Sequence, residues 1–291
     1  MSYVIIVDSA SNLVEEQLSQ YEIEIIPYYI NVDGKEVSCF ERNEDDVEKA
    51  KRFYDHIRKG GDAHTSLINP ERFCACFEPY LQQGRDVVFI GISSGLSGTV
   101  QAAKIAAEML SEKYPERKCI AIDSMAASLG EGIMAIELSQ ARARGEKLED
   151  SIAWLEKNRL KMACSFSVGD IKYLLKGGRV GSAVAKIGSV LNIKPMLYAS
   201  NEGKIALDRP VRGRKKALDT LVQKFLDAVV RPEEQIIGIA HCDCKPDADY
   251  VIGKILEKCK VKGVINNYYD LCTGAHVGPD AIALFYRVDA R

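Results

Sequence analysis

The sequence predicts an α/β fold of two domains, with a doubly wound parallel sheet in residues 1–160 and a mixed sheet in residues 161–291. Three observations lead to this prediction. In the first half, apolar strands, small polar loops and amphipathic helices alternate, as they do in βαβ units. In the second half, strands follow one another closely and one pair encloses a hairpin turn. A chain of 291 residues also has room for two ordinary domains.

The elements of the first half repeat the order strand, loop, helix. Residues 86–92 form a continuous apolar run, which is typical of a parallel strand buried on both faces. Asn69 and Pro70 are typical of the first residues of a helix. We expect strands at 3–7, 23–31, 86–92 and 118–122, a turn at 33–34 and a short extended piece at 64–66. We expect helices at 13–21, 45–60, 98–114, 126–144 and 148–160, and a further helix that begins at residue 70.

The second half has a different order of elements. Asn201, Glu202 and Gly203 form a hairpin-type turn between two short strands. No low-complexity linker separates this half from the first, so we expect the two domains to pack closely. We expect strands at 161–168, 195–200, 204–207, 235–240, 263–269 and 281–288, and helices at 182–191, 212–230 and 246–259.

The composition excludes several function classes. The chain has 39 Lys and Arg against 41 Asp and Glu, without the basic excess of a nucleic-acid-binding protein. No apolar run approaches the roughly 20 residues of a membrane span, and the N-terminus lacks the pattern of a secretion signal. Nine cysteines without a framework spacing indicate reduced thiols in a cytoplasmic protein. Four histidines, none at i, i+4 spacing, argue against a metal site.

The loop Ser93–Thr99 carries the clearest sign of a ligand site. It lies between a predicted buried strand and a predicted helix, and in open α/β sheets ligands bind beyond the carboxyl ends of strands. The helix that begins near Gly98 offers unpaired N–H groups and the positive end of its dipole. Three serines and a threonine add hydroxyl donors. The loop is therefore suited to hold an anion.

Other interpretations of this loop stay open at this stage. Ser97 or Thr99 can simply cap the helix. Residues 91–95 match G-x-S-x-G, the nucleophile elbow of a serine esterase or thioesterase, with Ser93 as nucleophile and His241 or His276 as base. Four further loop residues before the helix, and the lack of an oxyanion segment, count against the esterase. Phosphate binding is disfavoured, since the loop lacks G-K-[ST] and G-x-G-x-x-G.

Motifs spread over residues 8–279 together resemble the DegV family of fatty-acid-binding proteins. The order of the motifs carries the resemblance, since no single motif is decisive. Ser93–Thr99 has the family's loop sequence S-S-G-L-S-G-T. The other matching segments are Asp8-Ser9 with Ser11, Thr65-Ser66 ahead of Pro70, Asp123-Ser124, Leu175–Val180, Ile193–Pro195, Val211-Arg212 with Lys215–Leu218, and His276–Pro279.

The resemblance implies a DegV-like two-domain fold that holds a long-chain fatty acid between or within its domains. It implies that the carboxylate is held by Thr65, by the candidates Ser93, Ser94 and Ser97, and by His276. The position of Ser97 near the helix start favours it over Ser93. The implied protein is a carrier without catalysis of its own and without a cofactor. It presents the acid to a separate fatty-acid kinase, which phosphorylates the carboxyl group.

Further expectations concern the rest of the chain. Asp280 stands where the family has glycine, and it brings a negative charge near the expected head site. Arg179 and Arg212 belong to a basic cluster that we interpret as a docking patch for the kinase. We expect a monomer whose contact with membranes is transient. Candidate walls for the fatty-acid tail are Leu67, Ile68, Phe73, Leu96, Leu129, Ile133, Leu174, Ile187, Val190 and Leu191.

Overall fold

The computed structural model describes residues 3–181, 184 and 192–291, and it contains a parallel sheet in the first half of the chain. Its strand order is β2-β1-β6-β7, and each neighbouring pair is parallel. All six residues of β1 are buried, which explains the uninterrupted apolar run of its sequence. The strands are β1 (Tyr3–Asp8), β2 (Ile23–Ile26), β6 (Asp86–Gly91) and β7 (Cys119–Asp123).

Helices cover both faces of this sheet, as expected for a doubly wound fold. On one face lie α3 (Pro70–Gln82) and α4 (Thr99–Lys113), and the Asn69 side chain caps α3 by accepting from the Arg72 N–H. On the other face lies α5 (Leu129–Ala143), which also packs against the second sheet. Most residues of α5 are buried, since it separates the two sheets. The parallel sheet and the helices that cover it are therefore built as the sequence predicts.

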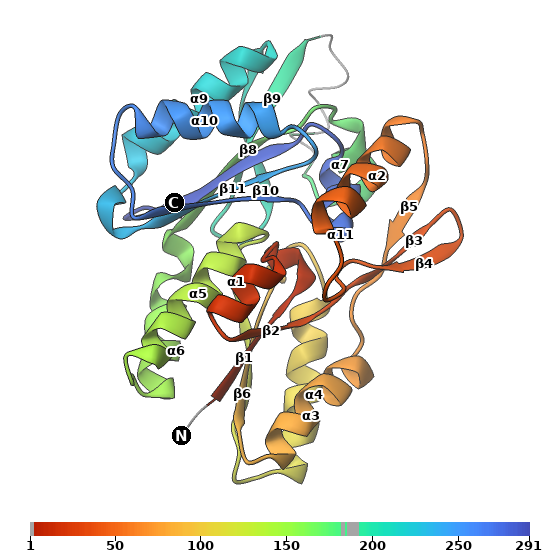
Figure 1. Cartoon of the computed structure of the whole chain (residues 1–291), viewed down its shortest axis with the longest axis vertical. Helices are drawn as coiled ribbons and strands as arrows, with labels where there is room; N and C mark the ends of the chain where they lie inside the picture. The colour runs from red at the N-terminus through yellow and green to blue at the C-terminus, as the bar shows by residue number, and fades with distance from the viewer. Residues whose placement is uncertain (1–2, 182–183, 185–191) are drawn as a thin grey trace.

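The second sheet is mixed, also as predicted, with the order β10-β9-β8-β13-β11-β12. Only the pair β11 and β12 is parallel, and the other four pairs are antiparallel. Two helices, α9 (Arg214–Ala228) and α10 (Lys245–Leu256), cover the face turned away from α5 (Figure 1). The strands are β8 (Met162–Ser167), β9 (Ile193–Ala199), β10 (Ile205–Arg212), β11 (Ile236–His241), β12 (Gly263–Tyr268) and β13 (Ile282–Arg287).

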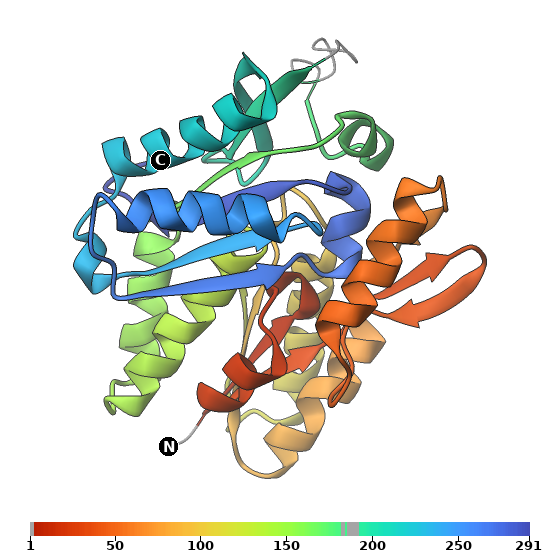
Figure 2. The same cartoon turned by 45° about the horizontal axis from the view of Figure 1, so that its top comes forward.

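A small third sheet was not predicted. The expected single strand at 23–31 is two strands, since Pro27 lacks the N–H that a continuing ladder needs. The third sheet has the order β4-β3-β5 and is antiparallel. Its strands are β3 (Tyr29–Val32), β4 (Lys35–Ser38) and β5 (Ala63–Thr65), and Figure 2 shows the β3–β4 hairpin standing away from the two larger sheets beside α2 (Asp46–Arg58).

A short helix, α11 (Leu271–Val277), was also missed. The Asp270 side chain caps it by accepting from the N–H groups of Cys272 and Thr273. The helix packs against α7 (Lys172–Gly177), α2 and β5, so it links the second half of the chain to the third sheet. The helix expected at 182–191 lies outside the described residues apart from residue 184. The remaining elements are α1 (Glu15–Gln20), α6 (Leu148–Asn158) and the 3-10 turns Ser9–Ser11, Arg159–Lys161 and Pro232–Glu234.

Candidate functional site

An apolar cavity lies between the first two sheets, at the switch point of the parallel sheet. There the chain leaves β1 toward β2 and leaves β6 toward β7, so the loops after the two strands diverge. Ala10 and Ile92 from these loops line the cavity. Phe166, Ile205 and Phe285 from the second sheet line the facing wall. The site is therefore where an open α/β sheet is expected to bind a ligand.

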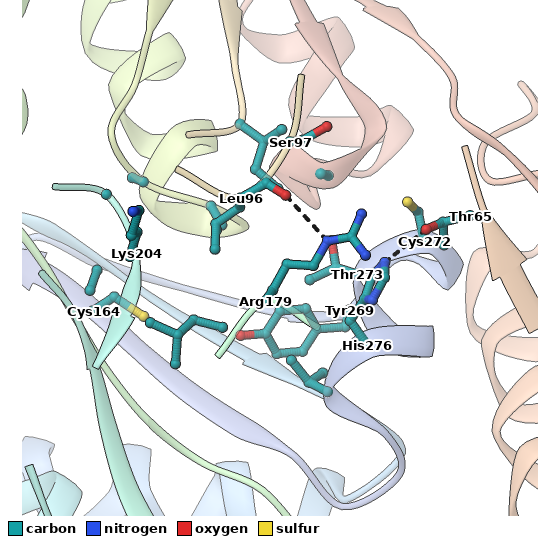
Figure 3. Close-up of a pocket in the computed structure, with 18 of the residues that line it drawn as sticks. Thr65, Leu96, Ser97, Cys164, Arg179, Lys204, Tyr269, Cys272, Thr273 and His276 are labelled. Atoms are coloured by element: carbon teal, nitrogen blue, oxygen red, sulfur yellow. Dashed lines mark hydrogen bonds between the residues drawn. The ribbon is translucent and has the colours of Figure 1, made fainter. Parts of the chain in front are cut away.

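One end of the cavity carries a hydroxyl and an imidazole in contact. Thr65 Oγ1 at the end of β5 lies 2.8 Å from His276 Nε2 on α11, although the two residues are 211 positions apart (Figure 3). Burial, with a smaller contribution from the neighbouring Arg179, lowers the pKa of His276 to about 4. His276 is therefore neutral at pH 7 and can donate only one N–H. Both residues were predicted site residues, and the structure brings them together.

A chain of hydroxyl groups reaches the same cavity from the loop before α4. Tyr28, which is buried, donates its O–H to Thr99 Oγ1 at 2.8 Å. Thr99 Oγ1 lies 2.9 Å from Ser97 Oγ, which also accepts from the Thr99 N–H at 3.3 Å. Tyr28 and Ser97 line the cavity. Sequence reasoning missed Tyr28, and no signal marks it, since its partner lies 71 residues further along the chain.

Ser93 and Ser94 do not line the cavity. Ser93 is fully buried, and its hydroxyl donates to the Gly203 carbonyl at 2.8 Å. Ser94 is exposed, and its N–H donates to Asp123 Oδ1 at 3.2 Å. The structure thus separates these two serines from Thr65, Ser97 and His276, and gives them the role of fixing the loop against its neighbours.

Two carboxylates brace the loops around the switch point. The Asp8 side chain accepts from the Ala10 N–H at 2.9 Å and from the Ile92 N–H at 3.1 Å, so it ties the loop after β1 to the loop after β6. Burial raises the pKa of Asp8 to about 7. Asp123 accepts from the N–H groups of Ser94 and Met125. Both aspartates stand at strand ends, where the sequence analysis placed them.

The two arginines of the predicted docking patch lie in different surroundings. Arg179 lines the cavity, and its side chain donates to the carbonyls of Leu96 and Gly177 at 3.3 and 2.5 Å (Figure 3). Arg212 is exposed at the end of β10, away from the residues that line the cavity. Of the two arginines, only Arg179 lines the cavity, where Lys204 is a second cation of the lining.

Asp280, which stands where the family has glycine, keeps a glycine-like backbone. Its φ is +64°, in the left-handed region that an aspartate adopts less readily than glycine. Its carboxylate accepts from Arg58 Nη2 at 2.9 Å, and Arg58 also binds Asp243. The negative charge is thus paired with α2. Asp280 does not line the cavity.

Of the predicted tail-wall residues, Leu67 and Leu96 line the cavity. Most of the others lie in the hydrophobic core instead. The prediction failed for them because a periodic pattern in the sequence cannot distinguish a cavity wall from a core position. Those in the core are Ile68, Phe73, Leu129, Ile133 and Leu174. Ile187, Val190 and Leu191 lie outside the described residues.

The described residues carry no candidate metal site and no candidate membrane span. Among residues 3–181, 184 and 192–291, no group of His, Cys, Asp and Glu is placed to hold a metal ion. Within the same residues, no helix is long and apolar enough to cross a membrane. The fold and the cavity together define a two-sheet α/β protein with an apolar internal cavity that is polar at one end.

This chain belongs to the DegV family. A family model described as "Uncharacterised protein, DegV family" matches residues 2–289. A DegV domain-containing protein of Clostridium perfringens is 36% identical over 289 residues, which are 99% of this chain and 98% of the relative. The match therefore covers nearly the whole of both proteins.

Solved structures of the family have the same fold. A DegV family protein from Thermus thermophilus, described by its fatty acid binding, superposes with a TM-score of 0.87 at 26% identity, covering 99% of this chain and 100% of that one. DegV from Bacillus subtilis, described as a fatty acid binding protein, gives a TM-score of 0.83 at 26% identity over 99% and 100% of the two chains.

Proposed function

We propose that this protein binds one long-chain fatty acid, with the carboxylate at Thr65, Ser97 and His276 and the tail along the apolar cavity. The observation that carries the proposal is the contact between Thr65 and His276 in a cavity whose lining is mostly apolar. Relatives of the same fold are described as binding fatty acids. Of the predicted serines, we propose Ser97 and leave out Ser93 and Ser94, since only Ser97 lines the cavity.

The tail provides the affinity and the head provides the orientation. A saturated chain of roughly fifteen methylenes gains about 12 kcal/mol when it is buried, at about 0.8 kcal/mol for each CH₂. Part of this gain is lost to the ordering of the chain. A carboxylate buried without partners costs several kcal/mol, so it must meet donors. The hydroxyl and imidazole groups at one end of the cavity therefore decide which end of the ligand enters there.

The hydrogen-bond directions leave protons for a ligand oxygen. Tyr28 donates to Thr99, so the Thr99 proton is available to Ser97 Oγ and the Ser97 proton remains for the ligand. With its proton on Nε2, His276 donates to Thr65 Oγ1, and the Thr65 proton also remains. Arg179, at the cavity wall, adds a positive charge that favours the anion. With this tautomer of His276, the site offers a set of donors to a carboxylate.

The competing serine esterase finds little support in this geometry. Its nucleophile, Ser93, is fully buried. The described partners of its hydroxyl are the Gly203 carbonyl and the Gly95 N–H, so it lacks a described contact with a histidine. A nucleophilic serine needs a base within hydrogen-bond reach. We therefore propose a carrier without turnover.

The titration of His276 tests the position of the carboxylate. In ¹³C-histidine-labelled protein, the chain gives four histidine signals, and we expect His276 to titrate near pH 4 without ligand. A nearby carboxylate favours the imidazolium form, so saturating oleate should raise the pKa of His276. Oleyl alcohol, which has the same tail without the charge, serves as the control and should raise the pKa less. An unchanged pKa with bound oleate would place the carboxylate elsewhere.

We further propose that the bound acid is presented to a fatty-acid kinase that docks on the basic patch around Arg212. Arg212 is exposed, lies outside the cavity lining and belongs to a cluster with Arg209, Lys215 and Lys216. Charges at the rim of an interface mainly raise the rate of encounter.

The cysteines support a cytoplasmic setting, since all nine are free thiols and five of them are buried. We propose a monomer that contacts membranes only transiently.

Arg212→Ala should leave oleate retention unchanged but lower acyl-phosphate formation by a supplied fatty-acid kinase roughly tenfold at low salt. The difference from wild type should shrink as salt screens the patch. Arg52→Ala, an exposed arginine on α2, is the matched control and should behave as wild type. Normal kinase coupling in Arg212→Ala would refute the docking patch while leaving fatty-acid binding untouched.

A further inference from the structure

A second cavity opens at the carboxyl ends of the parallel strands β11 and β12, where α/β sheets bind ligands. It encloses about 550 Å³, within the usual range for small-molecule sites. Elements of the first half of the chain close it, namely the loop before α1, the residues after β4 and the first turns of α2. Its lining includes Leu13, Val14, Phe40, Asp46, Val47, Lys51, His241, Asp243, Lys245, Asn266, Tyr268, Tyr269 and Leu271.

His241 presents an unused donor to this cavity. The residue is only 2% exposed and ends β11. Its Nδ1 accepts from the Cys244 N–H at 3.4 Å, which places the proton on Nε2. Its ring packs on the Tyr268 ring at 4.4 Å between centroids. Burial lowers the pKa of His241 to about 4, so the ring is neutral. Among the described residues, Nε2–H has no hydrogen-bond partner and is not sealed from solvent, so it is available to a molecule in the cavity.

Most charged groups around the cavity are already paired. Asp243 accepts from Arg58 and Tyr268. Lys245 pairs with Asp249 and Lys49 with Glu44. The Asp270 carboxylate, which also lines the cavity, accepts from the N–H groups of Cys272 and Thr273. Among the described residues, Lys51 has no ion-pair partner and is exposed at the rim, so a second unused donor faces a bound molecule.

Two acceptors near the cavity would suit a ligand that donates hydrogen bonds rather than one that accepts them. Asp46 also lines the cavity without a described ion pair, and burial raises its pKa to about 6. The Asn266 amide oxygen lacks a partner but is sealed from solvent. An ammonium ligand that binds Asp46 is thus the natural competitor. His241 favours an acid instead, because its ring is only 2% exposed and gains a charged partner there, whereas the half-buried Asp46 carboxyl is readily reached by water.

Apolar side chains make up much of the remaining lining, which also includes Ser9, Asn12 and Asn267. Leu13, Val14, Phe40, Val47 and Leu271 surround the polar groups, and Val47 is 46% exposed, so the cavity can be reached from solvent. An apolar wall with a few convergent polar groups is the usual composition of a small-molecule site. Its ligand must therefore have a compact apolar body and an acceptor head.

We propose that this cavity is a second binding site, which takes a small organic acid with a compact apolar body, its carboxylate accepting from His241 Nε2–H and facing Lys51. The site is separate from the fatty-acid cavity, although the two share a wall. Tyr269 lines both cavities, Leu271 lines the second, and Cys272 and His276 of α11 line the first. The proposal does not depend on fatty-acid binding.

The test uses 4-fluorophenylacetate as the acid and 4-fluorophenethylamine as the competing ammonium, both followed by ¹⁹F NMR with oleate-saturated protein. We expect the acid to bind saturably with a Kd of about a millimolar or tighter, and the amine to bind at least tenfold more weakly. In ¹³C-histidine-labelled protein, the largest shift should fall on His241. A larger shift on His276, or tighter binding of the amine, would overturn the proposal.

Variants separate the donor from general effects on folding. His241→Phe keeps an aromatic ring packed on Tyr268 and removes the N–H donor, so it should weaken the binding of the acid at least tenfold. Lys51 is exposed, so Lys51→Gln should not disturb packing, and it should weaken the binding of the acid about threefold. His64→Phe, on an exposed side chain outside the cavity, is the matched control and should bind as wild type does. Wild-type affinity in both Lys51→Gln and His241→Phe would overturn the proposal.

Discussion

The double variant Thr65→Val, Ser97→Ala should release bound oleate at least a hundredfold faster than wild type. Each hydroxyl is proposed to donate to the carboxylate, and a hydrogen bond to a charged group contributes about 1.5–3 kcal/mol. Losing both therefore costs about 3 kcal/mol or more, which is about a hundredfold or more in affinity. Valine has the shape of threonine and suits the strand β5, so the fold should remain intact. Stopped-flow transfer of a fluorescent fatty acid measures the release rate.

Ser94→Ala is the matched control for this variant. Ser94 lies in the same loop as Ser97, but its side chain does not line the cavity, and its N–H bond to Asp123 survives the substitution. Release from Ser94→Ala should be the same as from wild type. Unchanged release from the double variant, with circular dichroism showing an intact fold, would remove Thr65 and Ser97 from the head site.

Gly274→Ala should lower the free energy of unfolding by about 2–4 kcal/mol, since a Cβ there has no room. The added carbon would lie 2.2 Å from the hydroxyl of Tyr54, a fully buried side chain. That hydroxyl donates to the Tyr269 carbonyl at 2.8 Å, so moving it breaks a buried hydrogen bond. Gly274 lies in α11 two residues before His276, and a displaced helix should also weaken oleate retention.

Gly253→Ala gives the comparison for Gly274→Ala. Gly253 lies inside α10, and nothing lies within 4 Å of an added Cβ. Alanine is the better helix former, so this variant should be more stable than wild type by about 0.5–1 kcal/mol. Urea unfolding of the two variants measures the difference. Equal stability of Gly274→Ala and wild type would show that α11 does not depend on its close contact with α2.

The sequence could predict the architecture because strands and loops leave local signals. Buried parallel strands are continuous apolar runs, and the loops after β1 and β6 had to meet at one edge of the sheet. The Ser93–Thr99 loop was therefore placed near the ligand region from its position at a strand end. The split of the strand at Pro27 was predictable in principle, since proline has no N–H for the ladder.

The parts of the site that escaped sequence reasoning depend on contacts between distant residues. Thr65 and His276 are 211 residues apart, and only the family resemblance joined them beforehand. The loop sequence does not say which serine faces the cavity, since this depends on how the turn hydrogen-bonds to its neighbours. Arg179 was grouped with Arg212 by charge, yet it lines the cavity. Helix α11 has only seven residues, too few for a helical period to be recognised.

The mass of whatever the protein carries tests the central claim most directly. Native mass spectrometry of protein purified from cells should show one long-chain fatty acid per chain, and extraction under denaturing conditions should release it as the free acid. The same measurement gives its chain length and unsaturation. A protein that is purified without ligand, and that also fails to take up oleate or palmitate, would contradict the proposal that this cavity holds an acyl carboxylate.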